Sequence, residues 1–141
     1  MRPGVSRRLD RVLAALRRLD RLSSMSLGEI EEGDLLPLLE REVEVVIQGL
    51  LDLGSYIISS SGWAPPSSYS EIGHILARHG VLPKAEGERI SRMARLRDIV
   101  VHAYPDIDYA MLHGYAAQLR LDARRSLEYM LSYMRERGID P

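Results

Sequence analysis

The segment from Leu35 to Ser59 constrains the fold more than any other part of the chain. It reads LLPLLEREVEVVIQGLLDLGSYIIS, and in an α-helix its apolar residues would cover more than half of the circumference. A helix this apolar has to be surrounded by other elements, so the segment predicts the central helix of a helical bundle. Pro37 is compatible with this helix only because it would occupy the first turn.

The segments on either side of this helix also have helical patterns. Residues 9–22 carry apolar side chains three and four positions apart, and we expect that helix to end in the polar sequence SSMS. The sequence SSSGWAPPSS is rich in Ser, Pro and Gly and predicts a loop. After it, Ser68 and Glu71 have the spacing of a capping box, which predicts a short helix that stops at Gly80.

Two more helices are expected in the last third of the chain. One begins near Lys84 and cannot continue through Pro105, because the residue before a proline is disfavoured in helical geometry. The other begins after Asp106 or Asp108, either of which can cap it, and ends near Gly138. The sequence contains no strand hairpin signal, so the predicted fold class is all-α, an up-down bundle of about five helices.

Length and residue usage exclude several classes of protein. The 141 residues fit a single domain, 1–141, and the absence of Cys excludes disulfides, thiolate chemistry and cysteine-bound zinc. The charged N-terminal segment does not resemble a signal peptide, and no run approaches the roughly 18 apolar residues of a membrane span. We therefore expect a cytoplasmic protein that does not associate with a membrane. His74, His79 and His113 lack metal-ligand spacing, so neither a metal site nor a cofactor is expected.

The charge pattern leaves binding to nucleic acid open. A net charge of -1 gives no overall attraction to phosphate, so any contact would have to come from local clusters. Lys84 is the only lysine among 19 basic residues, and arginine suits bidentate phosphate contacts. Ion-pair networks within the protein would explain the same bias. The arginines group in three clusters: Arg7, Arg8 and Arg11; Arg92, Arg95 and Arg97; and Arg120, Arg124 and Arg125.

The sequence RLRDIVVHAYPDID, from Arg95 to Asp108, carries the candidate catalytic residues. On a regular helix Arg97 and Tyr104 fall within about 20° of each other, whereas His102 lies roughly 140° from Arg97. His102 can join Arg97 only if the helix unwinds around Val101, and the proline that follows Tyr104 gives a reason for it to do so. The apolar residues between Arg97 and His102 are expected to anchor the segment in the core: Ile99, Val100 and Val101.

These residue types suit cleavage of RNA without a metal ion. Histidine can remove the proton from a ribose 2′-OH near neutral pH, and the planar guanidinium of arginine can stabilise charge on the attacked phosphate. A symmetric dimer would bring two copies of Arg97 and His102 to one cleft. The alternative is a structural role, in which His102 and Tyr104 cap the helix and pack on the bundle. Arg97 then pairs with Asp98 or with a carboxylate across an interface.

Three segments in their order and spacing resemble the HepT family of HEPN-domain proteins. They read LEREVEVVIQGLLDLGSYIIS, SYSEIGHILARHGVLP and RMARLRDIVVHAYPDID, and they cover the chain from about Leu39 to Asp108. The last is the most specific, because the family motif is an Arg, usually with a polar residue after it, then four to six residues and a His, to which HepT proteins add x-Tyr. Here the motif is Arg97, Asp98, His102 and Tyr104, with Asp98 where HepT proteins often have Asn.

The resemblance implies an all-α HEPN bundle and a type VII (HepT/MNT) toxin–antitoxin system. It implies a homodimeric, metal-independent endoribonuclease toxin that cleaves tRNA or mRNA with Arg97 and His102 as catalytic residues and Asp98 and Tyr104 supporting them. The implied partner is an MNT nucleotidyltransferase antitoxin that can transfer AMP to Tyr104. Adenylylation there would add bulk and negative charge where an RNA phosphate has to bind.

Two other interpretations remain open. The chain can be a catalytically inactive HEPN module that binds a nucleotidyltransferase partner or a nucleotide, and Asp98 together with the low net charge favours that interpretation. It can also be a purely structural helical dimer. Trp63, in the loop, can stack on an RNA base or can cover the end of the bundle as a satellite of the core.

Overall fold

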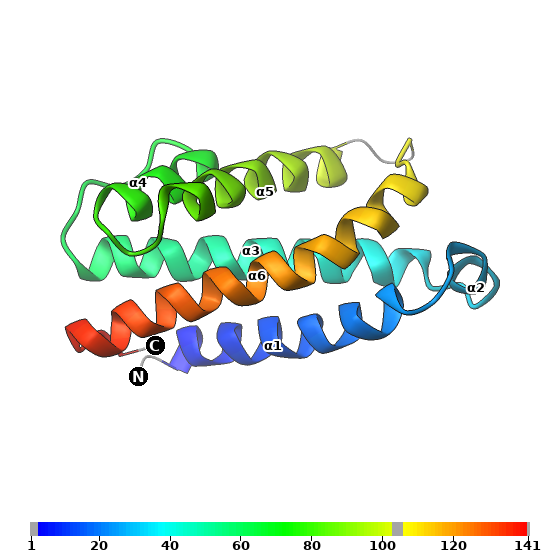
Figure 1. Ribbon diagram of the computed structural model, residues 1–141, viewed down its shortest axis with the longest axis horizontal. Coiled ribbons are helices and arrows are strands. Elements are labelled where there is room, and N and C mark those ends of the chain that lie inside the picture. The colour runs from blue at the N-terminus through cyan, green and yellow to red at the C-terminus, as the bar shows by residue number, and fades with distance from the viewer. Residues whose placement is uncertain (1–2, 103–105, 141) are drawn as a thin grey trace.

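The structure is a computed structural model that describes residues 3–102 and 106–140 (Figure 1). All regular elements in these two ranges are helical, which confirms the all-α fold class. Four helices are long, two are short, and a 3-10 turn precedes the second short helix. In chain order the elements are α1 (Pro3–Ser23), α2 (Leu27–Glu32), α3 (Leu36–Ser60), the 3-10 turn η1 (Tyr69–Glu71), α4 (Ile72–Arg78), α5 (Lys84–His102) and α6 (Tyr109–Arg137).

The four long helices form the predicted up-down bundle. Each runs in the direction opposite to the long helix before it, and the two chain ends lie at the same end of the molecule (Figure 1). Helix α3 is central, as predicted, because it packs against α1, α4, α5 and α6. Pro37 lies in its first turn, where its missing N–H has no helical partner to lose.

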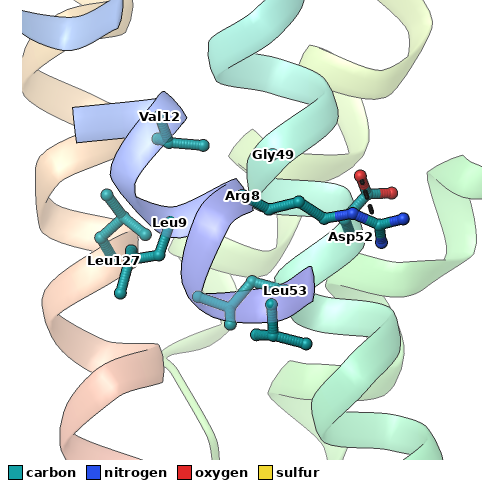
Figure 2. Close-up of a pocket in the computed structure, with 8 residues that line it drawn as sticks. Arg8, Leu9, Val12, Gly49, Asp52, Leu53 and Leu127 are labelled. Carbon is teal, nitrogen blue, oxygen red and sulfur yellow. Dashed lines mark ion pairs between the residues drawn. The ribbon is translucent and has the colours of Figure 1, made fainter. Parts of the chain in front are cut away.

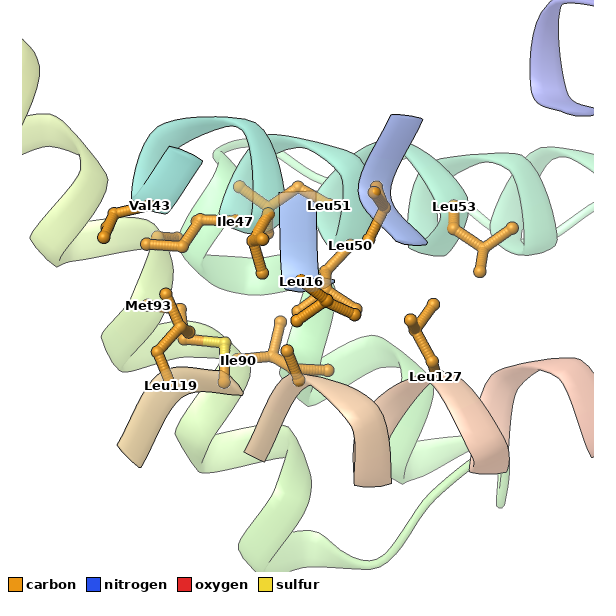
Figure 3. Packing of buried hydrophobic residues seen from close by; sticks show 14 of the residues in the cluster. Leu16, Val43, Ile47, Leu50, Leu51, Leu53, Ile90, Met93, Leu119 and Leu127 are labelled. Carbon is orange, nitrogen blue, oxygen red and sulfur yellow. The ribbon is translucent and has the colours of Figure 1, made fainter. Parts of the chain in front are cut away.

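The core consists of aliphatic side chains and methionines around α3. Figure 3 shows Ile47 and Leu50 of α3 among side chains from α1, α5 and α6, including Leu16, Ile90 and Leu119. All five are almost fully buried. This continuous burial explains the wide apolar surface of the α3 sequence. By length and hydropathy α3 also meets the criterion for a membrane-spanning helix, but half of its most apolar window is buried inside the bundle.

Helix α2 was not predicted and raises the number of α-helices in the described residues to six. Its N-cap is Ser26, whose Oγ accepts a hydrogen bond from the Glu29 N–H at 3.1 Å, while the Glu29 carboxylate accepts one from the Ser26 N–H at 3.0 Å. Hydrogen bonding to the Glu29 carboxylate, chiefly from the Ser26 backbone N–H, lowers the pKa of Glu29 below its ordinary value. The SxxE pattern of a capping box was therefore present in the sequence at this position.

The capping box predicted at Ser68 and Glu71 is wrong in its details. The Ser68 side chain makes no capping bond, and the Glu71 carboxylate instead accepts hydrogen bonds from the N–H and Oγ of Ser67, at 2.6 and 2.5 Å. These bonds from Ser67 lower the pKa of Glu71. The residues after Ser68 form η1 before the α-helix begins, and α4 ends as predicted near Gly80, which adopts a positive φ of 76°.

Helices α4 and α5 approach each other closely at two glycines. A Cβ on Gly87 would lie 2.5 Å from the carbonyl oxygen of Gly73, so neither position has room for a side chain. Next to this contact, the Ser91 Oγ donates a hydrogen bond to the Ser70 carbonyl oxygen at 2.6 Å. The glycine pair and this hydrogen bond together hold η1 against α5.

Helix α6 begins at the predicted cap. The Asp108 carboxylate accepts a hydrogen bond from the Met111 N–H at 3.0 Å, and Gly138 terminates the helix in the left-handed conformation. Midway along the helix, Arg124 donates two hydrogen bonds to the carboxylate of Asp20 in α1, at 2.8 and 2.7 Å. These bonds, with a smaller contribution from Arg120, lower the pKa of Asp20.

Candidate active site

Arg97 lies on the face of α5 that points toward the core. It follows the buried residues Ile90 and Met93 at helical spacing and precedes the buried residue Val100. Its side chain is only 21% exposed, which is unusual for a group that carries a permanent charge. The position of Arg97 on α5 therefore places a cation at the edge of the hydrophobic core.

Among the described residues the guanidinium of Arg97 contacts a carboxylate and an aromatic ring. Its Nη1 lies 3.3 Å from Oδ1 of Asp98, whose side chain is 57% exposed, and its Cζ lies 5.3 Å from the centre of the Tyr69 ring. The Nε atom is buried and has no hydrogen-bond partner among the described residues. The Arg97 side chain is partly exposed, and the one carboxylate that it meets among the described residues is open to solvent and contacts only Nη1, so the guanidinium keeps donors for a ligand with negatively charged oxygens.

The predicted partners of Arg97 fall at the end of α5. The backbone is helical through Val101 to His102, so the predicted unwinding around Val101 is wrong. The His102 side chain and all of Tyr104 lie outside the described residues, and of the four motif residues the structure brings together Arg97 and Asp98.

One of the predicted core anchors is also wrong. Val100 is buried as expected, but the side chain of Ile99 is 56% exposed. Ile99 is displaced from Arg97 by two residues, about 200° around the helix, so it faces away from the core. The side chain of Val101, the third predicted anchor, lies outside the described residues. An exposed isoleucine therefore precedes His102 by one helical turn.

The three arginine clusters have different environments. In the last cluster Arg120 and Arg124 pair with Asp20, while Arg125 pairs with Glu86 and Asp122. The hydrogen bond to Glu86 raises the pKa of Arg125 further above its already high value. This cluster forms ion pairs within the bundle and gives no sign of a phosphate site.

The cluster on α5 is less engaged. Arg92 and Arg95 are exposed and form no ion pair in the part of the chain that the structure describes, and Arg97 pairs only with Asp98. In the first cluster Arg8 lies 3.8 Å from Asp52, beside a small apolar pocket between α1 and α3 (Figure 2). That pocket is built from α1, α3 and α6, and Arg97 does not contribute to it.

The remaining candidates from the sequence take structural positions. Trp63 is partly buried against the core and stacks on His79, with ring centres 3.7 Å apart and planes within 9°, as expected of a satellite of the core. His113 Nε2 lies 2.8 Å from the Met25 carbonyl oxygen and links α6 to the segment before α2. Within residues 3–102 and 106–140, His, Asp and Glu form no group that could hold a metal ion.

Sequence reasoning missed Tyr69. It stands 28 positions before Arg97, in a serine-rich turn, and its contact with Arg97 arises only because η1 packs on α5. Residue spacing carries no information about this contact. The available signal was compositional, since PPSSYSE places one large aromatic side chain in an otherwise polar turn.

The fold matches those of several solved structures. A HEPN toxin from Shewanella oneidensis, tri-AMPylated and in complex with an MNT antitoxin, is 13% identical with a TM-score of 0.82, over 94% of this chain and 99% of that one. YutE from Bacillus subtilis, a cytosolic protein of unknown function, is 22% identical with a TM-score of 0.82, over 99% and 94% of the two chains. A toxin–antitoxin structure with AMP-PNP is 13% identical with a TM-score of 0.78, over 92% and 99%.

These similarities confirm the HEPN toxin fold that the three sequence segments imply. Comparison with curated protein sequences gives no match. The family described as "Ribonuclease HepT-like" matches from residue 12 to residue 130, which includes α3, α5 and the whole motif from Arg97 to Tyr104. Because this match covers most of the chain, the protein belongs to the ribonuclease HepT-like family.

Proposed function

We propose that this protein is the toxin of a type VII (HepT/MNT) toxin–antitoxin system and a metal-independent endoribonuclease that needs no cofactor. The observation that carries the proposal is the incomplete set of hydrogen-bond partners around the Arg97 guanidinium, in a chain of the HepT-like family. Its guanidinium is mostly buried, its Nε has no partner among the described residues, and its one carboxylate partner is exposed. A phosphodiester of RNA would provide the missing acceptors.

The proposed reaction assigns different roles to Arg97 and His102. The His102 imidazole removes the proton from a ribose 2′-OH, and the oxygen attacks the adjacent phosphorus. The bond from phosphorus to the 5′-oxygen then breaks, and the leaving oxygen takes up a proton. Arg97 binds the non-bridging oxygens and stabilises the charge that builds up on them. The substrate class is RNA, either tRNA or mRNA, and the single domain 1–141 carries the activity.

A homodimer is part of the proposal. One chain supplies one arginine and one histidine of the motif, which are few for a base, an acid and a phosphate ligand, and a symmetric second copy doubles both. Two exposed apolar side chains near this end of the bundle support a shared face, namely Ile99 one turn before His102 and Met111 in the first turns of α6. Burial of both in a dimer would remove apolar surface from water.

The proposed antitoxin is an MNT nucleotidyltransferase that transfers AMP to Tyr104 or masks the site. The solved complex of a tri-AMPylated HEPN toxin with an MNT antitoxin supports this pairing by fold similarity. The proposed location is the cytoplasm, where both RNA substrates are present. Intact mass spectrometry after co-expression with the partner should show added AMP, and the addition should disappear in Tyr104→Phe. Full modification of the Tyr104→Phe variant would exclude Tyr104 as the acceptor.

The central experiment is expression of the protein alone, with growth and RNA integrity as readouts. Wild type should arrest growth and degrade RNA, while His102→Ala and Arg97→Ala should do neither. Arg95→Ala is the matched control, because Arg95 lies on the same helix but is exposed and makes no ion pair within the described residues. If wild type is harmless, or if all three variants behave like wild type, the ribonuclease proposal fails.

The alternative is an inactive HEPN module that binds a nucleotidyltransferase partner or a nucleotide. The 3.3 Å contact between Arg97 and Asp98 favours it, because the carboxylate competes with phosphate for the guanidinium. Under the ribonuclease proposal, Asp98→Asn keeps the side-chain shape, removes the competing charge and should raise RNA affinity and cleavage. Under the alternative, purified Asp98→Asn binds the partner but still cleaves no RNA.

A further inference from the structure

Tyr69 occupies an unusual position beside Arg97. Its side chain is 46% exposed, the higher value of the two exposed tyrosines among the described residues. The guanidinium of Arg97 lies over the ring, with Cζ 5.3 Å from the ring centre. The Tyr69 ring therefore contacts Arg97, the side chain that is proposed to bind the RNA phosphate, while a large part of the ring surface remains open to solvent.

The turn that carries Tyr69 is anchored on both sides. Before it, Ser67 donates two hydrogen bonds to the carboxylate of Glu71, at 2.6 Å from its N–H and 2.5 Å from its Oγ. After it, the carbonyl oxygen of Ser70 accepts a hydrogen bond from Ser91 of α5 at 2.6 Å. These bonds fix the backbone of η1 relative to α5. Tyr69 is thus exposed on a turn whose backbone is fixed by hydrogen bonds, and its ring is positioned before any ligand binds.

A hollow of about 330 Å³ adjoins the Tyr69 ring. The volume falls in the range of roughly 300–1,000 Å³ that small-ligand sites occupy. The hollow has both polar and apolar surface, a combination that suits the edge and the plane of a nucleobase. It is lined by Ser55, Pro66, Ser67, Ser68, Tyr69 and Ile72.

We propose that Tyr69 stacks on the nucleobase next to the phosphate that Arg97 binds, and that the Pro66–Ser68 turn forms the wall of this base pocket. The inference rests on the proposed ribonuclease function and adds a substrate-positioning residue to it. Single-stranded RNA is the ligand, because only unpaired bases can leave the stack and lie on an aromatic ring. An arginine beside an exposed aromatic ring provides one contact for the phosphate and another for the base.

The test separates RNA binding from cleavage. In a His102→Ala background, which blocks the proposed chemistry, binding of a single-stranded RNA oligonucleotide is measured by fluorescence anisotropy. Tyr69→Ala should weaken binding roughly 5- to 150-fold, because stacking on an aromatic side chain contributes about 1–3 kcal/mol per base. Tyr69→Phe should retain the affinity. Tyr129→Ala is the matched control, since Tyr129 is an exposed tyrosine on α6.

A modified oligonucleotide tests the base contact directly. An RNA that lacks the nucleobase beside the scissile phosphate should bind wild type and Tyr69→Phe more weakly than the intact RNA does. With Tyr69→Ala, removal of the base should change the affinity little, because the ring it contacts is already gone. A structural role for Tyr69 would lower the affinities for both RNAs by the same factor.

Failure of this inference can be distinguished from failure of the proposed function. If wild type cleaves RNA and Tyr69→Ala binds and cleaves equally well, the base pocket is refuted while the ribonuclease stands. If Tyr69→Ala impairs binding of the antitoxin but not of RNA, the pocket is a protein contact and the inference is again refuted. If wild type neither cleaves nor binds RNA, both proposals fail.

Discussion

Replacement of Gly73 by alanine gives the sharpest test of how α4 is held on α5. A Cβ at Gly73 would overlap the carbonyl oxygen of Gly87 and lie 3.0 Å from the Oγ of Ser91. Ordinary van der Waals contacts of a Cβ lie at 3.4–4 Å. The main obstacle is backbone, which cannot rotate away as a flexible side chain can. The two helices therefore have to move apart, and the motion loosens the hydrogen bond between Ser91 and Ser70.

The expected magnitude combines two opposing effects. Overpacking of a well-filled interior costs about 1–3 kcal/mol, and a backbone obstacle places Gly73→Ala near the upper end of that range. Alanine has a higher helix propensity than glycine, and this difference offsets about 1 kcal/mol of the overpacking cost. The free energy of unfolding should therefore fall by about 2 kcal/mol. For a chain of this length the midpoint of thermal unfolding should fall by roughly 6–8 °C.

Gly114→Ala is the matched control for this experiment. Gly114 lies inside α6, and a Cβ there would meet no atom within 4 Å. The same chemical change should therefore stabilise the protein by about 0.5–1 kcal/mol, because only the propensity difference acts. Both variants are measured by urea denaturation and by circular dichroism on heating. The reasoning is refuted if Gly73→Ala is as stable as wild type, or if both substitutions shift stability by the same amount.

Three further predictions concern packing and charge elsewhere in the bundle. Gly49→Ala should destabilise the protein by up to about 2 kcal/mol in urea denaturation, because the new Cβ overlaps Cγ2 of Val12 while the gain in helix propensity offsets about 1 kcal/mol, and a second substitution, Val12→Ala, should restore part of the loss. Hydrogen bonds from Arg124 lower the pKa of Asp20. The ion pair therefore stabilises the fold at pH values above 3.8, the ordinary pKa of an aspartate, and this stabilisation is lost as the pH falls through the lowered pKa of Asp20. Asp20→Asn should therefore reduce stability by at most about 1 kcal/mol at pH 7, since Asp20 is partly exposed, and should match wild type in strong acid. Burial raises the pKa of Tyr115 to about 12, so its stabilising contribution is complete below the ordinary tyrosine pKa of 10.0 and is lost as the pH rises toward 12. Tyr115→Phe should lose less stability over that interval and lack the latest phase of a phenolate absorbance titration.

The helices themselves were largely predictable from the sequence. The period of the apolar residues, Pro37 in a first turn, the Asp108 cap and the glycine at 138 predicted α1, α3, α5 and α6 close to their observed limits. These are local effects, because a cap or a helix period depends on residues within one or two turns. The short helix α2 was missed although Ser26 and Glu29 have the capping-box pattern, since six residues are too few for a clear apolar period.

The candidate site was predictable only in part. The motif located Arg97 and Asp98, and their contact was one of the alternatives considered from the sequence. The path of the chain after Arg97 was misjudged, because Pro105 was expected to unwind the helix around Val101 and the helix instead continues to His102. Tyr69 could not be found from spacing, and its role depends on the packing of η1 against α5.

By itself, the sequence determined which segments are helical, which of them is central, and which residues carry the family motif. Helix periodicity, caps and motif spacing are properties of near neighbours along the chain, so they can be read without coordinates. Only the tertiary structure decided which groups meet across the bundle. The close approach of Gly73 and Gly87 brings η1 onto α5, and this places Tyr69 against Arg97. Such contacts depend on the shapes of two packed surfaces, and no local pattern in the sequence records them.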